Sequence, residues 1–128
     1  RENAGALAHL MTDTLADAMP DYTEGRLVHF DLFPGNVLME NGAVNAVIDF
    51  GATAMIADPR LELWSAVAYL DSEISPDATD EDRNFAMGWL AQRGLDVDYT
   101  AARRWIAAYW CFAQDDPKVM AWCRSILA

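Results

Sequence analysis

The stretch HFDLFPGNVLMENGAVNAVIDFG, residues 29–51, decides the fold because it sets polar side chains among apolar ones at informative spacings. Within it, Asn41 and Gly42 separate two short apolar runs that are rich in Val and Ile. An Asn-Gly pair between such runs is a strong signal for a two-residue β-hairpin turn. The sequence therefore predicts a hairpin in which Glu40 faces Ala43.

This pairing would bring two polar side chains together. Counting outward from the turn puts Asn36 opposite Val47, with Asp49 two residues further on. Because side chains alternate between the faces of a strand, Asn36 and Asp49 should share one face at a diagonal separation of about 7–8 Å. Their oxygens suit Mg²⁺, which takes its remaining ligands from water and substrate phosphates. A three-residue bulged loop would reverse this parity.

Asp31 lies five residues before Asn36 and directly after residues 26–30, RLVHF, which are typical of a strand. A loop that leaves a strand in this way can present a carboxylate beside a metal without adding it to the ligand set. Such a group can accept or orient the proton of an attacking hydroxyl. A turn or cap would explain Asp31 by itself, but not its spacing from both Asn36 and Asp49.

Composition limits the class of protein. The 128 residues, 53% of them apolar and 23% charged, fit one globular domain or one lobe of a larger one. The formal net charge of −11 argues against binding to nucleic acid or anionic membranes and favours a cationic partner. No apolar run approaches the roughly 18 residues of a membrane span, and the first residues do not resemble a secretory signal. We expect a soluble, cytoplasmic protein.

The rest of the chain is predicted to be mainly helical. A helix over residues 3–19 would contain His9, which has no second metal-ligating residue at a suitable spacing. Asp58 as N-cap and Pro59 at the first helical position mark the start of the next helix. The predicted helices after this point cover residues 60–70, 79–93, 99–114 and 117–127.

Tryptophan and cysteine carry no sign of a ligand site. We expect the five tryptophans to pack in the core rather than to stack on a ligand. They are Trp64, Trp89, Trp105, Trp110 and Trp122. Cys111 and Cys123 lack a CxxC spacing, so free thiols in a reducing compartment are expected.

Two motifs in the opening stretch resemble those of protein-kinase-like enzymes. The pattern H-x-D-L-x-x-x-N is matched by His29, Asp31, Leu32 and Asn36. The metal-binding D-F-G pattern is matched by residues 49–51, and the whole run from residue 27 to 64 is similar to the aminoglycoside phosphotransferase and choline kinase family. The resemblance implies an α+β, mainly α fold: a protein-kinase-like C-terminal lobe with a short catalytic-loop β-hairpin surrounded by helices.

The resemblance also implies roles for the matched residues. Asp31 would be the catalytic base, while Asn36 and Asp49 would bind Mg²⁺ and, through it, ATP. His29 would brace the loop, and Gly51 would let the chain bend away from the metal. The implied reaction is transfer of the γ-phosphoryl group of ATP to the hydroxyl of a small molecule.

The chain departs from the family pattern at two positions. The glycine that usually separates the histidine from the aspartate is Phe30 here. The aspartate that commonly anchors the catalytic loop is replaced by Glu62. Glu62 could keep that anchor, or it could simply favour the helix N-terminus, where negative charge is stabilised.

Short spacings favour a small-molecule acceptor over a protein. Only nine positions separate Asp49 from Asp58, too few for a segment that positions a peptide. The acidic segment from Asp71 to Asp82 could attract the ammonium groups of an aminoglycoside, or it could be a solvated loop with helix-capping acids. Asp115 and Asp116 have the same two interpretations.

Nothing before His29 could supply the nucleotide-binding lobe that the family fold needs. We therefore expect residues 1–128 to form a single domain, the C-terminal lobe alone, with the missing N-terminal lobe as a partner. The chain would be a fragment of a longer enzyme or a truncated gene product, and it should bind ATP poorly by itself. Three alternatives remain: a kinase for choline, homoserine or a macrolide, a catalytically silent binding module, and a Mg²⁺-dependent hydrolase.

Overall fold

The structure is a computed structural model that describes residues 24–128. The helix predicted over residues 3–19, with His9, lies outside the described residues. The described elements are, in chain order, β1 (Arg26–Val28), the 3-10 helix η1 (Pro34–Asn36), β2 (Val37–Glu40), β3 (Ala43–Val47), β4 (Met55–Ala57), α2 (Arg60–Ala68), α3 (Asp80–Ala91), α4 (Tyr99–Trp110) and α5 (Pro117–Leu127). This part of the chain is α+β and mainly helical, which confirms the predicted class.

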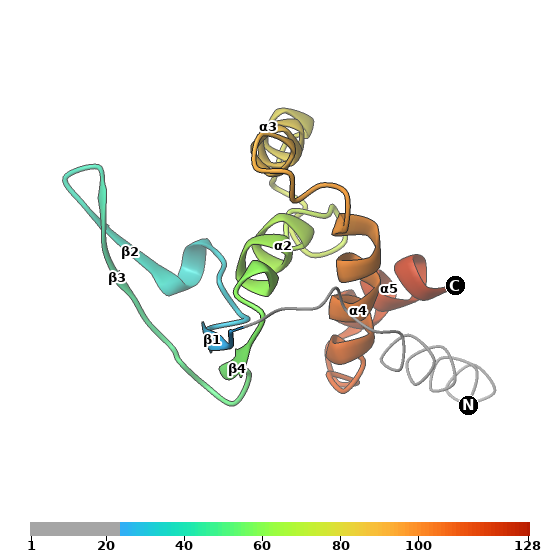
Figure 1. The fold of residues 1–128 in the computed structure, drawn as a ribbon. Coiled ribbons are helices and arrows are strands. Elements are labelled where there is room, and N and C mark those ends of the chain that lie inside the picture. The colour runs from blue at the N-terminus through green and yellow to red at the C-terminus, as the bar shows by residue number, and fades with distance from the viewer. Residues whose placement is uncertain (1–23) are drawn as a thin grey trace.

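Strands β2 and β3 form the predicted hairpin, which extends away from the helices (Figure 1). Asn41 and Gly42 have φ angles of 52° and 77°, and Glu40 pairs with Ala43. Two consecutive positive φ angles are the signature of the two-residue turn that an Asn-Gly pair favours. The turn is therefore the one that the sequence predicts.

The register of the hairpin differs from the prediction beyond the turn, because β3 contains a β-bulge. Val47 pairs with Val37 and not with Asn36. The backbone N–H of Ile48 donates to the Asn36 carbonyl instead, at 2.9 Å. A bulge adds a residue to one strand only, so side chains beyond it change faces relative to the partner strand. The parity argument that put Asp49 on the face of Asn36 is therefore wrong.

A second two-stranded sheet, of β1 and β4, joins the segments on either side of the hairpin. Leu27 lies opposite Ile56 in this antiparallel pair. The strand predicted over residues 26–30 ends at Val28, because Phe30 has a φ of 62°, outside the range of an extended strand. The chain thus leaves β1, forms the loop and the hairpin, and returns through β4 to α2.

The helix starts follow the predicted signals with one difference, at α2, and three helices end before the predicted residue. Helix α2 ends at Ala68 rather than at residue 70, and α3 ends at Ala91 rather than at residue 93. Pro59 takes the N-cap position of α2 in place of Asp58, whose Oδ1 still accepts the backbone N–H of Arg60 at 2.9 Å. Helix α4 ends at Trp110 rather than at residue 114, because the Gln114 N–H donates to Phe112 in a tight turn. The starts of α3 and α5 lie within one residue of those predicted.

The core lies where α2, α4 and α5 pack together. Trp64 and Trp122 are fully buried, and the other three tryptophans pack against the core from partly exposed positions, as predicted. Cys111 and Cys123 are buried free thiols, also as predicted. Across residues 24–128, no helix combines the length and the hydrophobicity needed to cross a membrane.

Candidate active site

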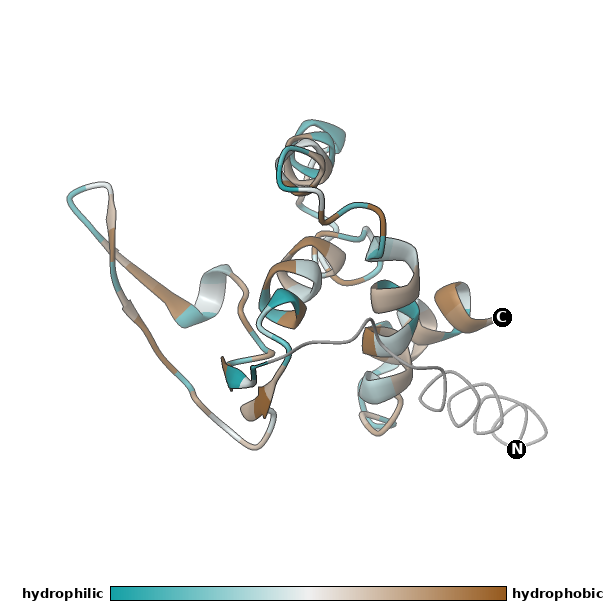
Figure 2. Ribbon diagram, in the orientation of Figure 1, coloured by the Kyte–Doolittle hydropathy of each residue, from teal (hydrophilic) through white to brown (hydrophobic). Residues whose placement is uncertain are grey.

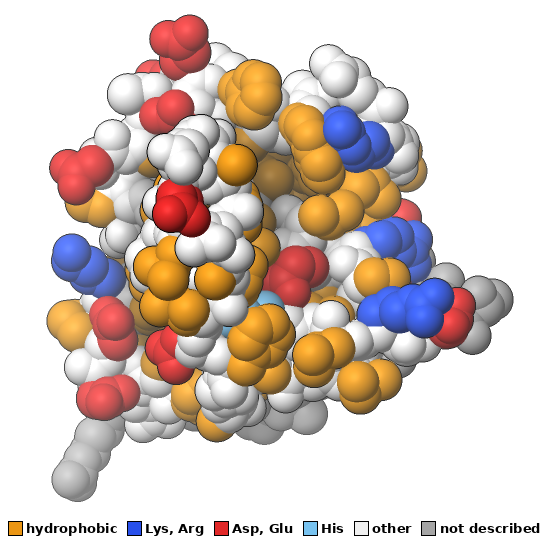
Figure 3. All heavy atoms as spheres, turned by 90° about the vertical axis from the view of Figure 1, so that its left-hand side faces the viewer, with side chains coloured by type: hydrophobic (Ala, Val, Ile, Leu, Met, Phe, Trp, Pro, Cys, Tyr) orange, Lys and Arg blue, Asp and Glu red, His pale blue; other side chains and the backbone are white. Residues whose placement is uncertain are grey.

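The loop from His29 to Asn36 brings together two of the three predicted site residues. The side-chain Nδ2 of Asn36 donates to the backbone carbonyl of Asp31 at 2.9 Å, and the Asn36 side chain is buried. Asp49 follows the hairpin and lies close enough for its charge to act on Asp31. In Figure 3, this side of the molecule shows acidic side chains and histidine in a hollow bordered by hydrophobic side chains.

The pKa of the Asp31 carboxyl group is raised above its ordinary value of 3.8, mainly because partial burial removes water from the charged form. Of the weaker influences, His29 and a hydrogen bond from Asn36 lower this pKa, while the carboxylate of Asp49 raises it. Two carboxylates that repel each other are stabilised by a cation placed near both. The electrostatics of the site therefore favour binding of a cation.

His29 connects the loop to the end of the hairpin. Its Nε2 lies 2.7 Å from the Ile48 carbonyl, and its Nδ1 accepts the backbone N–H of Asp31 at 3.2 Å. These two bonds require the neutral tautomer with the proton on Nε2. The ring also meets Phe50 edge to face, with 4.5 Å between centroids. His29 thus links the backbone of Asp31 to the residue that precedes Asp49, which agrees with a supporting role.

Glu62, in the first turn of α2, holds the backbone of the loop. Its carboxylate accepts the N–H groups of His29 and Phe30, at 2.5 Å and 3.2 Å. Of the two roles left open by the sequence, the anchor is therefore present in the structure. The extra methylene of glutamate relative to aspartate does not prevent these contacts.

Phe30 occupies the position where the family commonly has glycine, and its φ of 62° shows why glycine suits it. A side chain in this left-handed conformation costs about 1–2 kcal/mol. Phe30 offsets this cost by complete burial of its ring, which lies 4.9 Å from the ring of Tyr109 between centroids. The substitution is therefore accommodated by packing against α4.

The bend after the hairpin lies at Asp49 rather than at Gly51. Asp49 has a φ of 62°, a conformation that aspartate adopts more readily than most residues. A Cβ atom added to Gly51 would meet no atom closer than 3.9 Å. The structure therefore shows no steric need for glycine at position 51, and the left-handed backbone conformation in this segment belongs to Asp49.

The donor atoms near Asp31 fit Mg²⁺. Because Nδ2 of Asn36 is engaged with Asp31, its amide oxygen remains for a metal, and the exposed Asp49 supplies a carboxylate. Within residues 24–128, no three His, Cys, Asp or Glu side chains group together to form a complete metal site. One amide and one carboxylate oxygen instead suit an ion that keeps waters and takes phosphate oxygens as further ligands.

Much of the acidic segment is engaged within the protein. Asp71 accepts hydrogen bonds from Arg103 and from Trp122, and Asp82 completes a capping box at the start of α3. Asp116 is the N-cap residue of α5, and its side chain accepts the backbone N–H groups of Lys118 and Val119. These contacts favour the capping interpretation for Asp82 and Asp116.

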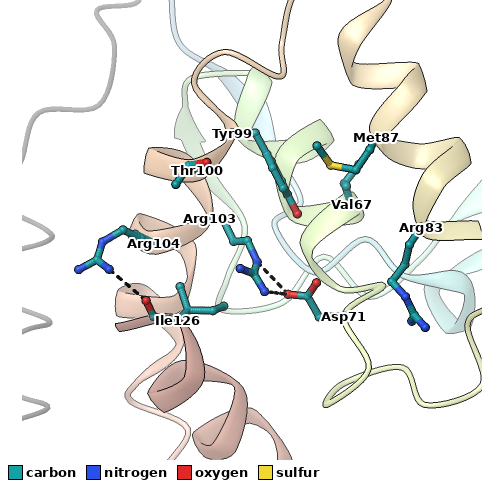
Figure 4. Close-up of a pocket in the computed structure, with 9 residues that line it drawn as sticks. All are labelled: Val67, Asp71, Arg83, Met87, Tyr99, Thr100, Arg103, Arg104 and Ile126. Atoms are coloured by element: carbon teal, nitrogen blue, oxygen red, sulfur yellow. Dashed lines mark hydrogen bonds and ion pairs between the residues drawn. The ribbon is translucent and has the colours of Figure 1, made fainter. Parts of the chain in front are cut away.

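A cavity of about 400 Å³ lies between the helices, apart from the loop. Figure 4 shows Tyr99, Met87 and Val67 around it, with the ion pair of Arg103 and Asp71 beside them. None of its lining residues belongs to the loop or to the D-F-G motif. The cavity is therefore separate from the candidate site.

Two supporting residues could not be found from the sequence. Thr53 Oγ1 donates to the His29 carbonyl at 3.2 Å, and the Tyr69 hydroxyl donates to the Phe30 carbonyl at 2.7 Å. Both contacts join segments far apart in the chain. Tyr69 stands in an apolar helical run, where the sequence indicates only packing.

A mainly helical α+β unit with these two motifs around a hairpin has the features of a phosphotransferase. A sequence model of the phosphotransferase enzyme family matches residues 3–109, and the chain belongs to this family. This match confirms the resemblance seen in the motifs. Comparisons with curated proteins and with solved structures gave no match. Kinases of the family generally use ATP and Mg²⁺.

Proposed function

We propose that this chain is the C-terminal lobe of a protein-kinase-like phosphotransferase that moves the γ-phosphoryl group of ATP to a hydroxyl of a small molecule. The observation that carries the proposal is the grouping of Asp31, Asn36 and Asp49 on a loop and hairpin of a family member. Such a grouping combines a proton acceptor with hard oxygen ligands, as phosphoryl transfer requires.

In this proposal each residue has one task. The Asp31 carboxylate accepts a hydrogen bond from the acceptor hydroxyl and orients its oxygen toward the phosphorus. Asn36 and Asp49 would hold Mg²⁺, which when bound offsets negative charge on the phosphate oxygens. His29 and Glu62 keep the loop backbone fixed, so that the acceptor meets a preorganised carboxylate.

We further propose that a nucleotide-binding lobe of the same enzyme covers the hairpin. Large hydrophobic side chains on β2, β3 and β4 are exposed, among them Met39 at 59%, Val44 at 62% and Ile56 at 70%. Figure 2 shows apolar stretches along β2 and β3, which extend away from the helices. An exposed apolar surface of this kind usually marks an interaction site.

For the acceptor, we propose a cationic small molecule of the aminoglycoside type, in the cytoplasm. The net charge of −11 supports attraction of ammonium groups. The partly exposed aromatic residues of α4 beside Phe30, Trp105 and Tyr109, offer rings on which a cation or a sugar can pack. Choline, homoserine and macrolides would use the same Asp31, Asn36 and Asp49, so they stay as alternatives.

The test is transfer of labelled γ-phosphate from ATP by the full-length protein, across aminoglycosides, choline, homoserine and macrolides. We expect Mg²⁺-dependent labelling of one class of acceptor, and the proposal favours the aminoglycosides as that class. Nucleotide binding without labelling of any class would contradict the proposal and favour a silent binding module. Release of phosphate from phosphorylated substrates without ATP would favour the hydrolase.

A further inference from the structure

Tyr69 is a buried residue at the C-terminal end of α2, outside both motifs that match the family. Its hydroxyl donates to the Phe30 carbonyl at 2.7 Å, and Nε1 of Trp110 lies 2.8 Å from the same hydroxyl. An indole N–H can only donate, so the bond from Trp110 uses the Tyr69 oxygen as acceptor. The phenolic proton is therefore directed toward Phe30.

The peptide that joins Phe30 to Asp31 is held at both of its polar groups. Tyr69 binds its carbonyl, and His29 Nδ1 accepts its N–H at 3.2 Å. The preceding N–H, that of Phe30, is held by Glu62 at 3.2 Å. Rotation of this peptide would break the first two bonds together, so Tyr69 contributes directly to the orientation of the Asp31 backbone.

This restraint acts on a backbone that would otherwise relax. The φ of Phe30 is 62°, and residues held in this region keep it only where the surroundings impose it. Asp31 follows immediately, so a change in the Phe30 conformation would move its carboxylate. A displacement of about 1 Å at a reacting group can cost about 100-fold in rate.

We propose that Tyr69 is a positioning residue for Asp31: its hydroxyl fixes the Phe30–Asp31 peptide and thereby the direction of the Asp31 carboxylate. This inference rests on the proposed function of Asp31. Tyr69 does not itself transfer a proton. Burial raises the pKa of its phenol far above the ordinary value of 10, so the hydroxyl remains a donor across the working pH range.

Tyr69→Phe in the full-length protein tests this role, because it removes the hydroxyl and keeps the ring. Tyr99→Phe is the matched control: Tyr99 is mostly buried, and it lines the cavity rather than the loop. The readouts are kcat and KM at saturating Mg²⁺ and ATP, the pH profile of kcat, and amide hydrogen exchange at Asp31.

For Tyr69→Phe we expect kcat to fall about tenfold or more, with KM for ATP within about twofold of the parent value. The pH profile should keep its shape, and the Asp31 amide should exchange about tenfold faster, since its peptide loses a restraint. Tyr99→Phe should change none of these. A kcat within about twofold of the parent, or an equal loss in Tyr99→Phe, would overturn the inference.

The two proposals fail in different ways. If the unaltered protein labels no acceptor, the proposed function is wrong. Faster exchange at Asp31 in Tyr69→Phe, but not in Tyr99→Phe, would still support the restraint on the loop. Unchanged exchange at Asp31 would overturn it whatever the activity.

Discussion

At the scale of single residues, Phe30 combines an unfavourable backbone conformation with favourable packing of its ring, and the packing is the larger effect. The left-handed conformation costs about 1–2 kcal/mol, whereas removal of a buried phenylalanine ring typically costs about 3–5 kcal/mol. The ring is fully buried against α4, so burial is the larger effect. The balance of these two terms can be measured.

We predict that Phe30→Gly destabilises the protein by about 2–4 kcal/mol, and Phe30→Ala by about 1 kcal/mol more, because alanine keeps the backbone cost. At most positions the alanine variant of a protein is more stable than the glycine variant, so the reversed order would show that residue 30 has a left-handed backbone conformation. Chemical denaturation of both variants measures it. If Phe30→Ala were the more stable of the two, φ at position 30 would not be a source of strain.

Glu62 provides a second prediction at this scale. Glu62→Gln replaces one carboxylate oxygen by an amide N–H, so one of the two loop N–H groups loses its acceptor. We expect a loss of about 1–2 kcal/mol in the free energy of unfolding. Glu81→Gln, at an exposed position in α3, is the control. An equal effect in both variants would show that the anchor contributes nothing specific.

At the scale of elements, the sequence predicted features that depend on local preferences better than features that depend on tertiary contacts. The Asn-Gly turn and the starts of α3 and α5 follow from short-range preferences that the sequence carries directly. The β-bulge in β3 and the pairing of β4 with β1 depend on how distant segments fit, so no local pattern indicates them. The structure brings Asn36 into contact with the backbone of Asp31, whereas the strand argument for Asp49 failed, and the roles of these residues stay predictions.

The thiols between α4 and α5 give a prediction at the scale of elements. Burial raises the pKa of Cys123 to about 12 and also raises that of Cys111. Both thiols donate to the Ala107 carbonyl. The native protein should therefore react with a thiol reagent at pH 8 only as fast as it unfolds, and urea should accelerate the reaction.

The same shift in pKa fixes the sign of a pH effect. Because the folded pKa of Cys123 exceeds the unfolded one, the unfolded chain loses the proton first as the pH rises. The contribution of the protonated Cys123 thiol to the stability of the folded protein is complete below about pH 8.5, and it decreases as the pH rises toward 12. Cys123→Ser should reduce this dependence in denaturation measured from pH 8 to 10. Rapid reaction of both thiols in the native state, or an unchanged pH dependence, would contradict the prediction.

At the scale of the whole molecule, the chain separates a polar site from a large helical core. The loop is held by Glu62 and Tyr69 from α2, while α4 packs against Phe30, so the helices position a site that they do not themselves form. The hairpin projects from this unit with its apolar side chains exposed (Figure 1). This exposed apolar surface is the feature on which we base the proposal of a second, nucleotide-binding lobe.

The most direct test of the account is the turnover of Asp31→Asn in the full-length protein, with nucleotide affinity measured in parallel. Asp96→Asn, at an exposed position away from the loop, is the control. Loss of a catalytic base should lower kcat by about 10²–10⁴-fold, while ATP binding stays within about twofold and Asp96→Asn behaves like the parent. A kcat for Asp31→Asn within about threefold of the parent value would contradict the assignment of Asp31, and with it the proposed site.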